Sequence, residues 1–147
     1  MIAIVCLDDN KGMLFNKRRQ SRDRKVTERV LELAGETRLW IDPFSAKLFG
    51  DGLPENITAD KEYLQKAGKG EFCFVETAGL KAAEDGLEKL VIFWWNRRYP
   101  SDVSLDLELE DWRKISEQDF AGMSHEKITE AVYRRKIEPF TEKGKTE

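Results

Sequence analysis

The chain has a single histidine, His125, and this is the residue best suited to acid–base chemistry. Imidazole changes its charge near neutral pH, so a histidine can serve as a general base or as a ligand. His125 stands between Ser124 and Glu126, but neighbours on a helix point in different directions and cannot form a catalytic triad by themselves. The sequence favours a surface or capping histidine. The alternative is an acid–base role with a partner from elsewhere in the chain.

The strongest polar feature is the segment Lys17–Lys25, in which six of nine residues are basic and one is acidic. It follows the first predicted strand and begins the first predicted helix, which is where ligands bind in parallel α/β sheets. A guanidinium can hold a phosphate or a carboxylate through two hydrogen bonds, helped by the positive end of a helix. A solvated loop paired with acidic neighbours and a contact with a partner protein stay open as alternatives. The candidate ligands here are Arg18, Arg19, Arg22 and Arg24.

A second candidate surface follows the apolar run LVIFWWN at Leu90–Asn96. Successive strand residues point to opposite faces, so one of the two tryptophans is expected at the surface. An exposed tryptophan beside arginines is typical of a protein–protein contact. Aromatic rings beside basic groups also suit stacking on nucleic-acid bases, but a core edge with a charged rim explains them as well. The residues of this candidate surface are Trp94, Trp95, Arg97, Arg98 and Tyr99.

The sequence offers little for metal chemistry. Its two cysteines, Cys6 and Cys73, lie in separate apolar runs without CxxC spacing, which favours buried, reduced thiols. A disulfide between them would require neighbouring strands. Asp8 and Asp9 end the first strand and would suit Mg²⁺, although followed by Asn10 they are more typical of a turn. We therefore expect no cofactor and no metal.

The composition bounds the class of protein. The chain has 147 residues, of which 40% are hydrophobic and 36% charged, and its net charge is −3. These values predict a folded domain without a general preference for nucleic acid or for anionic membranes. The N-terminal run lacks the basic start of a signal peptide, and no stretch approaches the roughly 18 apolar residues of a membrane span. We expect a cytoplasmic protein that does not bind a membrane.

The first half of the chain alternates strands with helices. This order predicts parallel pairing in a central sheet. Ile2–Leu7 is apolar throughout and is typical of a strand buried on both faces. Met13–Gln20 is predicted to be an irregular loop. The predicted strands are Ile2–Leu7, Arg38–Ile41, Glu71–Glu76 and Lys89–Trp95, and the predicted helices are Arg22–Ala34 (capped by Ser21 and Gly35), Ser45–Phe49, Ala59–Ala67 and Ala78–Asp85.

The second half is predicted to add antiparallel strands. Val103–Leu109 alternates apolar and polar residues, and Trp112–Ile115 is a further short strand. Ser124 is a plausible cap for a helix over His125–Lys136. The sequence thus predicts a single three-layer α/β domain over residues 1–141 with a mixed, mostly parallel sheet, and a frayed tail over residues 142–147.

The opening segment MIAIVCLDDNKGM resembles that of the dihydrofolate reductases, with the family's Gly-Met loop at Gly12 and Met13. The spacing of the next helix and strand agrees with this resemblance, as does Trp112 near a late strand. It implies a dihydrofolate-reductase-like fold over most of the chain.

The resemblance does not extend to the family's functional motifs. Its diglycine falls on Phe93, Trp94 or Trp95, and its phosphate-binding turn falls on Asp42–Ser45. Bulky indoles there would fill the space of a diphosphate. Its proline-tryptophan pair is absent, and its helix carboxylate has no counterpart in register, with Asp23 and Glu28 only nearby. A sheet that has lost its reductase site is therefore expected.

The chain also resembles small bacterial proteins labelled ribonuclease Z, through NKRRQSRDR, WWNRRYPSD and FAGMSHEKI. A metal-dependent nuclease of that name needs several histidines around two zinc ions, and this chain has one. We expect a binding module without catalytic activity. Its partner is expected to be a second copy of the chain or another protein, and nucleic acid is not favoured. The alternative is a nucleotide, phosphate or RNA ligand held by the Arg18–Arg24 loop.

Overall fold

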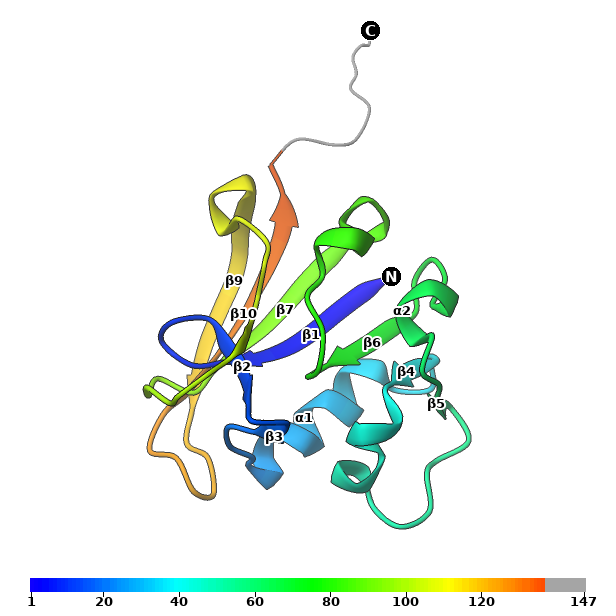
Figure 1. Cartoon of the computed structure of the whole chain (residues 1–147), viewed down its shortest axis with the longest axis horizontal. Coiled ribbons are helices and arrows are strands. Elements are labelled where there is room, and N and C mark those ends of the chain that lie inside the picture. Colours follow the sequence, from blue (N-terminus) through cyan, green and yellow to red (C-terminus); the bar gives the residue numbers. More distant parts are fainter. Residues whose placement is uncertain (137–147) are drawn as a thin grey trace, which may run out of the picture.

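The computed structural model describes residues 1–136 (Figure 1). The predicted tail over residues 142–147 and the last residues of the predicted domain lie outside this range. A seven-stranded sheet forms the centre of the described part, in the order β5-β4-β6-β1-β7-β10-β9. The first five strands of this order run parallel, and β10 and β9 are added antiparallel at one edge. The predicted α/β fold with a mixed, mostly parallel sheet is confirmed.

The strands and helices are short and follow one another closely. A second, three-stranded sheet has the order β3-β2-β8. The strands are β1 (Ile2–Leu7), β2 (Gly12–Phe15), β3 (Arg18–Arg19), β4 (Leu39–Ile41), β5 (Ile57–Ala59), β6 (Phe72–Val75), β7 (Lys89–Trp94), β8 (Val103–Ser104), β9 (Trp112–Phe120) and β10 (Ile128–Arg135). The helices are α1 (Arg24–Ala34) and α2 (Tyr63–Lys66), and the 3₁₀ segments are η1 (Pro43–Phe49), η2 (Lys81–Gly86) and η3 (Leu109–Asp111).

The strand β1 lies at the centre and pairs with β6 on one side and β7 on the other. Its residues alternate between two apolar cores, which explains why the whole run is apolar. Ile4 belongs to the core under α1, together with Val26 and Val30 of that helix. Val5 belongs to the core on the opposite face, under α2 and the segment that leads to β9. Both faces of the sheet are thus covered.

The helix predicted over His125–Lys136 is wrong, because this segment is the strand β10. It pairs with β7 from Thr129 to Tyr133 and with β9 along its whole length. The spacing of its apolar residues suits a helix, but a strand buried on both faces also lacks simple alternation. The β-branched residues Ile128, Thr129 and Val132 favour a strand.

Four further predictions need correction. The segment Ala59–Ala67 begins as the end of β5, and only the four residues of α2 within it are helical. The predicted loop Met13–Gln20 contains the hairpin of β2 and β3. Only the first two residues of Val103–Leu109 form a strand, β8, whereas the short strand predicted from Trp112 extends to Phe120.

The glycine at position 12 allows the β2 hairpin to approach the rest of the chain. A Cβ at this position would lie 2.6 Å from the side chains of Gln20 and Ser101. The backbone N–H of Gly12 donates to the Asp8 carboxylate over 2.7 Å. A side chain here would therefore separate the hairpin from the end of β1.

The two cysteines are free thiols and belong to different cores. Cys6 contacts the core under α1, and Cys73 lies in the core on the other face of the sheet. A disulfide between them is therefore not formed, although their strands are neighbours. Within residues 1–136 no helix is long and apolar enough to cross a membrane.

The central position of β7 predicts a large effect of core truncation. Ile92 is fully buried, whereas Ile115 on β9 is 44% exposed. We expect Ile92→Ala to lower the free energy of unfolding by about 2–4 kcal/mol, because it removes buried contacts and leaves a cavity. Ile115→Ala is the matched control and should cost less than about 1 kcal/mol. Urea denaturation measures both, and equal losses would contradict the placement of β7.

Candidate functional site

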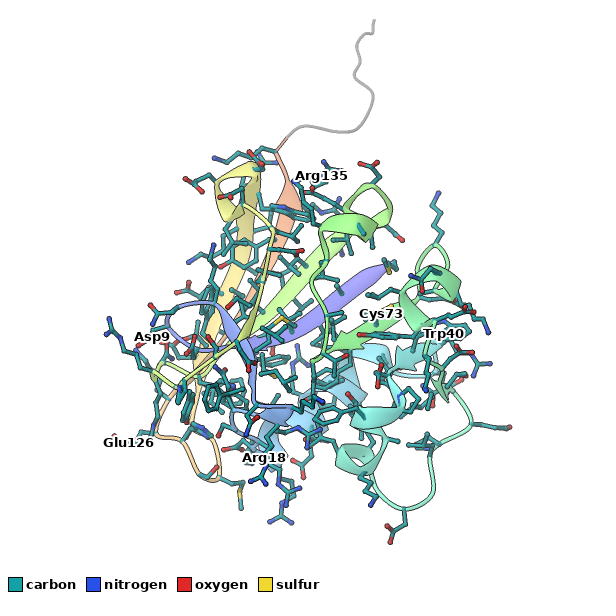
Figure 2. The ribbon with its side chains drawn as sticks, in the orientation of Figure 1. Asp9, Arg18, Trp40, Cys73, Glu126 and Arg135 are labelled. Carbon is teal, nitrogen blue, oxygen red and sulfur yellow. The ribbon has the colours of Figure 1, made fainter. Side chains whose placement is uncertain are left out.

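Several segments that are distant in sequence meet where the parallel strands end. The backbone N–H of Trp95 donates to Leu7, and that of Asp9 donates to Arg97, which joins the ends of β1 and β7. The start of α1 and the turn between β9 and β10 lie at this same end. Figure 2 shows Arg18 and Glu126 at this end of the molecule and Arg135 at the opposite end. Ligands bind at this edge in α/β sheets.

The carboxylate of Asp23 is the centre of the site and accepts five hydrogen bonds. Its Oδ1 accepts from the backbone N–H groups of Lys25 and Met123, both over 2.9 Å. Its Oδ2 accepts from the N–H of Ser124 over 2.8 Å, from the Ser124 hydroxyl over 3.1 Å and from Nδ1 of His125 over 3.0 Å. Asp23 is therefore the N-cap of α1, and the prediction that Ser21 caps this helix is wrong.

The environment keeps Asp23 ionised. Its side chain is fully buried, and burial alone would raise its pKa. The backbone N–H groups of Met123 and Ser124, together with His125 and Lys25, outweigh burial and hold the pKa of Asp23 well below its ordinary value. Donors that point at a carboxylate favour its charged form. Asp23 is thus a buried anion that can only accept hydrogen bonds.

His125 is 5% exposed and is oriented by contacts at both ring nitrogens. Because the Asp23 carboxylate can only accept, the Nδ1 that faces it carries a proton. On the other side, Nε2 lies 3.0 Å from the hydroxyl of Ser21 and 3.3 Å from that of Tyr99. In the neutral ring Nε2 is then an acceptor for these two hydroxyls. The favoured prediction of a surface histidine is therefore wrong, because the ring is buried against Asp23, Ser21 and Tyr99.

Trp95 lies inside this cluster. Its indole is 3% exposed and stacks on the His125 ring, with 4.5 Å between ring centroids and 22° between planes. Tyr99 and Trp94 are half-buried, whereas Arg97 and Arg98 are exposed. Of the predicted contact surface, only these two arginines are therefore fully presented to solvent.

Arg19 differs from Arg18, Arg22 and Arg24 because it forms an ion pair with the buried Glu76. Its Nε and Nη2 donate to the two carboxylate oxygens of Glu76, each over 2.7 Å, and Ser45 donates to the same carboxylate over 2.7 Å. These hydrogen bonds raise the pKa of Arg19 above its ordinary value. Its guanidinium also lies over the ring of Phe44, 5.0 Å from the centroid. Arg19 thus links the hairpin to β6 and, through Glu76, to η1.

A hollow of about 380 Å³ opens beside the start of α1. A small cavity of about 10 Å³ adjoins it and shares four wall residues with it. Ser21, Cys6, Glu76 and Trp95 line only this inner cavity. Arg18 lies on β3 and lines neither space. The residues around the outer hollow are Arg22, Asp23, Arg24, Thr27, Leu48 and Ser124.

Asp8 forms a turn. Its carboxylate accepts from the backbone N–H groups of Asn10, Gly12 and Tyr99 over 2.9, 2.7 and 3.0 Å, so the predicted turn is confirmed. Within residues 1–136 no three His, Cys, Asp or Glu side chains are grouped so that they could hold a metal ion. Burial and the nearby Glu76 raise the pKa of the Cys6 thiol, and burial raises the pKa of Cys73 to about 12.

The strands β6 and β7 run parallel to β1, one on each side of it, and both end at this edge of the sheet. By the resemblance described above, the family's diglycine falls on Phe93, Trp94 or Trp95, at the end of β7. In a phosphate site of that kind, the helix that follows the strand contributes its amino end. Here the 3₁₀ segment η2 follows β6 and not β7. The end of β6 carries Glu76 and Thr77, so paired glycines are absent there too.

Comparison with known proteins supports the fold and no more. Neither a family model nor a curated protein matches the chain. Among solved structures, it is similar to a dihydrofolate reductase from Enterococcus faecalis complexed with NADP(H) and RAB-propyl. The TM-score is 0.69, the identity is 12%, and the match covers 92% of this chain and 96% of that one. The predicted dihydrofolate-reductase-like fold is confirmed, and the resemblance to proteins labelled ribonuclease Z stays a prediction.

The low pKa of Asp23 predicts a stability loss in acid. Its pKa in the folded state lies below the unfolded value of about 3.9, so its contribution is complete above about pH 4 and is lost as the pH falls further. We expect Asp23→Asn to lower the free energy of unfolding at pH 7 by about 2 kcal/mol or more, because an amide NH2 then replaces one of the two acceptor oxygens and faces buried donors.

Urea denaturation between pH 7 and pH 2.5 tests this, with Asp51→Asn in an exposed loop as the control. The difference between wild type and Asp23→Asn should shrink as the pH falls below 4, while Asp51→Asn should follow wild type throughout. A difference that stays constant down to the lowest pH would show that Asp23 is not the acid-sensitive group.

Proposed function

We propose that the protein binds a small anionic molecule, bearing a phosphate or carboxylate group, in the hollow beside the start of α1. The observation that carries this proposal is the position of Arg22 and Arg24 in the wall of a hollow of about 380 Å³. Small-molecule sites usually enclose about 300–1,000 Å³ and contain a few converging polar groups. The hollow is at the low end of this range.

The charge of the two arginines is available to a ligand. Both side chains are exposed, and the arginines that form ion pairs within residues 1–136 are Arg19, Arg29 and Arg135. Asp23 is nearby, but its oxygens are already occupied by five donors from its own neighbourhood. A guanidinium pairs well with the planar oxygens of a carboxylate or phosphate. The arginines therefore favour an anion in the hollow.

The other groups around the hollow define the same ligand further. Thr27 and Ser124 line the hollow, and because both hydroxyls already donate to Asp23, their oxygens can serve a ligand only as acceptors. The amino end of the eleven-residue helix α1 adds a partial positive charge beside them. Leu48 gives one apolar wall. The combination suits a small molecule with one charged end and a short apolar part.

A contact with a partner protein at Trp94–Tyr99, which the sequence predicts, has less support than the anion site. Trp95, which would anchor such a contact, is buried under His125. A hot-spot anchor must be accessible before the partner arrives. Arg97 and Arg98 stay exposed there, Trp94 and Tyr99 are half-buried, and exposed arginines alone are typical of a solvated surface. Self-association through this segment is therefore the less supported hypothesis.

We expect anions to raise the thermal unfolding temperature of the protein through this hollow. The probes are pyrophosphate, nucleoside mono- and triphosphates, NADPH, and di- and tricarboxylic acids. A probe at a hundred times its dissociation constant stabilises a protein by about 2.7 kcal/mol, which is readily measured. The double variant Arg22→Ala/Arg24→Ala should lose this stabilisation.

The matched control is Arg18→Ala/Arg97→Ala, which removes the same charge from two exposed arginines outside the hollow. It should keep the stabilisation by the best probe. If both double variants lose it equally, the binding is a general effect of charge. If no probe stabilises wild type, the hollow is not an anion site.

A further inference from the structure

We propose that Ser21 is a nucleophile activated by His125, and that the protein hydrolyses small carboxylic esters. Asp23 acts as the positioning residue that orients the imidazole. The substrate class, an ester that carries a second, anionic group, rests on the proposed function of Arg22 and Arg24. The hydrolytic chemistry itself rests only on the three side chains.

The three side chains are arranged as a nucleophile, a base that contacts it, and a carboxylate that orients the base. Oγ of Ser21 lies 3.0 Å from Nε2 of His125, and Nδ1 of the same ring lies 3.0 Å from Oδ2 of Asp23. Such a series is recognised by distances and roles and not by order in the sequence, and it occurs on unrelated folds. Here Ser21 and Asp23 are close in sequence, and His125 comes from the other end of the described chain.

The proton positions also suit the reaction. Asp23 accepts from Nδ1–H, so the neutral imidazole presents an unprotonated Nε2 to the Ser21 hydroxyl. Stacking on Trp95 and the turn at Gly122, whose N–H donates to the His125 carbonyl over 2.9 Å, fix the plane of the ring. The base is therefore held in one tautomer and one orientation before a substrate binds.

Ser21 can be reached from the proposed anion site. Its side chain lines the small inner cavity of about 10 Å³, which shares Arg22, Asp23, Thr27 and Leu48 with the outer hollow, so an ester must displace these shared walls to meet Oγ. The residue is half-buried, as a nucleophile must be if it is to meet a substrate. An anionic group bound by Arg22 and Arg24 would therefore leave the rest of a short ester directed toward Ser21.

Two backbone groups beside Ser21 are available to the developing negative charge. The N–H groups of Arg22 and Asp23 donate to no acceptor within residues 1–136. In hydrolases with a serine nucleophile, N–H groups near the nucleophile stabilise the oxyanion of the tetrahedral intermediate. Arg22 also lines both the hollow and the inner cavity and adds a positive charge to their walls.

The reaction balances with water as the only co-reactant. Oγ of Ser21 attacks the carbonyl carbon, its proton passes to Nε2, and the carbonyl electron pair moves onto oxygen. As the pair returns, the bond to the leaving alkoxide breaks, and the proton on Nε2 moves to this alkoxide to release an alcohol. Water then attacks the acylated Ser21 and gives a proton to Nε2. The acid is released as the proton returns to Oγ.

A covalent probe tests the nucleophile. An ethyl fluorophosphonate would form an Oγ–P bond, release fluoride and pass the serine proton to Nε2. We expect wild type to gain one phosphonyl group, detected by intact-protein mass spectrometry and located on Ser21 by peptide mapping. General-base assistance is worth about 10²–10⁴-fold, so His125→Gln should label at least about 100-fold more slowly. Ser21→Ala should not label at all.

The control is Ser116→Ala, an exposed serine on β9, which should label like wild type. Circular dichroism and thermal unfolding report whether each variant is folded. Should His125→Gln fail to fold, Ser21→Ala decides the question alone. An unlabelled wild type, or labelling that survives in Ser21→Ala, would overturn the proposal.

The positioning role of Asp23 has its own spectroscopic test. Because His125 is the only histidine, a long-range ¹⁵N spectrum of its ring gives a single unambiguous signal pattern. We expect the Nδ1–H tautomer in wild type and a shift toward Nε2–H in Asp23→Asn. The Nε2–H tautomer in wild type would contradict the proposal, since Nε2 could not then accept the serine proton.

Two esters separate this inference from the proposed function. Hydrolysis of neutral 4-nitrophenyl acetate should depend on Ser21 and not on Arg22 and Arg24. Hydrolysis of mono-4-nitrophenyl succinate should be faster in wild type and should lose this advantage in Arg22→Ala/Arg24→Ala, but not in Arg18→Ala/Arg97→Ala. Loss of both activities in Ser21→Ala supports the nucleophile. Equal rates for the two esters in wild type would refute only the anion site.

Discussion

The buried carboxylate of Asp23 is the interaction on which the site depends. It joins the amino end of α1 to the turn before β10, because its donors come from both segments and from His125. A buried charge is tolerated only when donors compensate for the lost water. The five hydrogen bonds supply this compensation and fix the distance between helix and turn. The stack on Trp95, the approach of Ser21 and the hollow beside α1 all follow from that distance.

Part of the fold can be predicted from the sequence, because strands buried on both faces are continuous runs of apolar residues. The apolar runs around β1, β6 and β7 located the centre of the sheet. Apolar spacing gives the wrong prediction at β10, where Ile128, Val132 and Tyr133 are spaced as on a helix. A strand that packs on both faces has no fixed alternation, so periodicity could not separate the two structures. The β-branched residues were the better guide at this position.

Less of the site can be predicted from the sequence, because its residues are far apart in sequence and meet only in the folded chain. The basic segment Lys17–Lys25 marked the region, but not which arginine would be paired. Glu76 and His125 are 57 and 102 residues from their partners Arg19 and Asp23, and only the strand order brings them together. The similarity to a dihydrofolate reductase, at 12% identity, extends to the fold that brings these residues together. It does not account for the side chains at the strand ends.

The placement of the two thiols gives the protein a pair of built-in reporters. Cys6 is half-buried against the layer that contains α1, and Cys73 is fully buried in the layer on the other side of the sheet. A buried amide or thiol becomes reactive only when its own surroundings open locally. Alkylation of Cys73 under native conditions would therefore follow the local opening of its layer. Alkylation of the half-buried Cys6 supplies the comparison for a thiol that is already partly accessible.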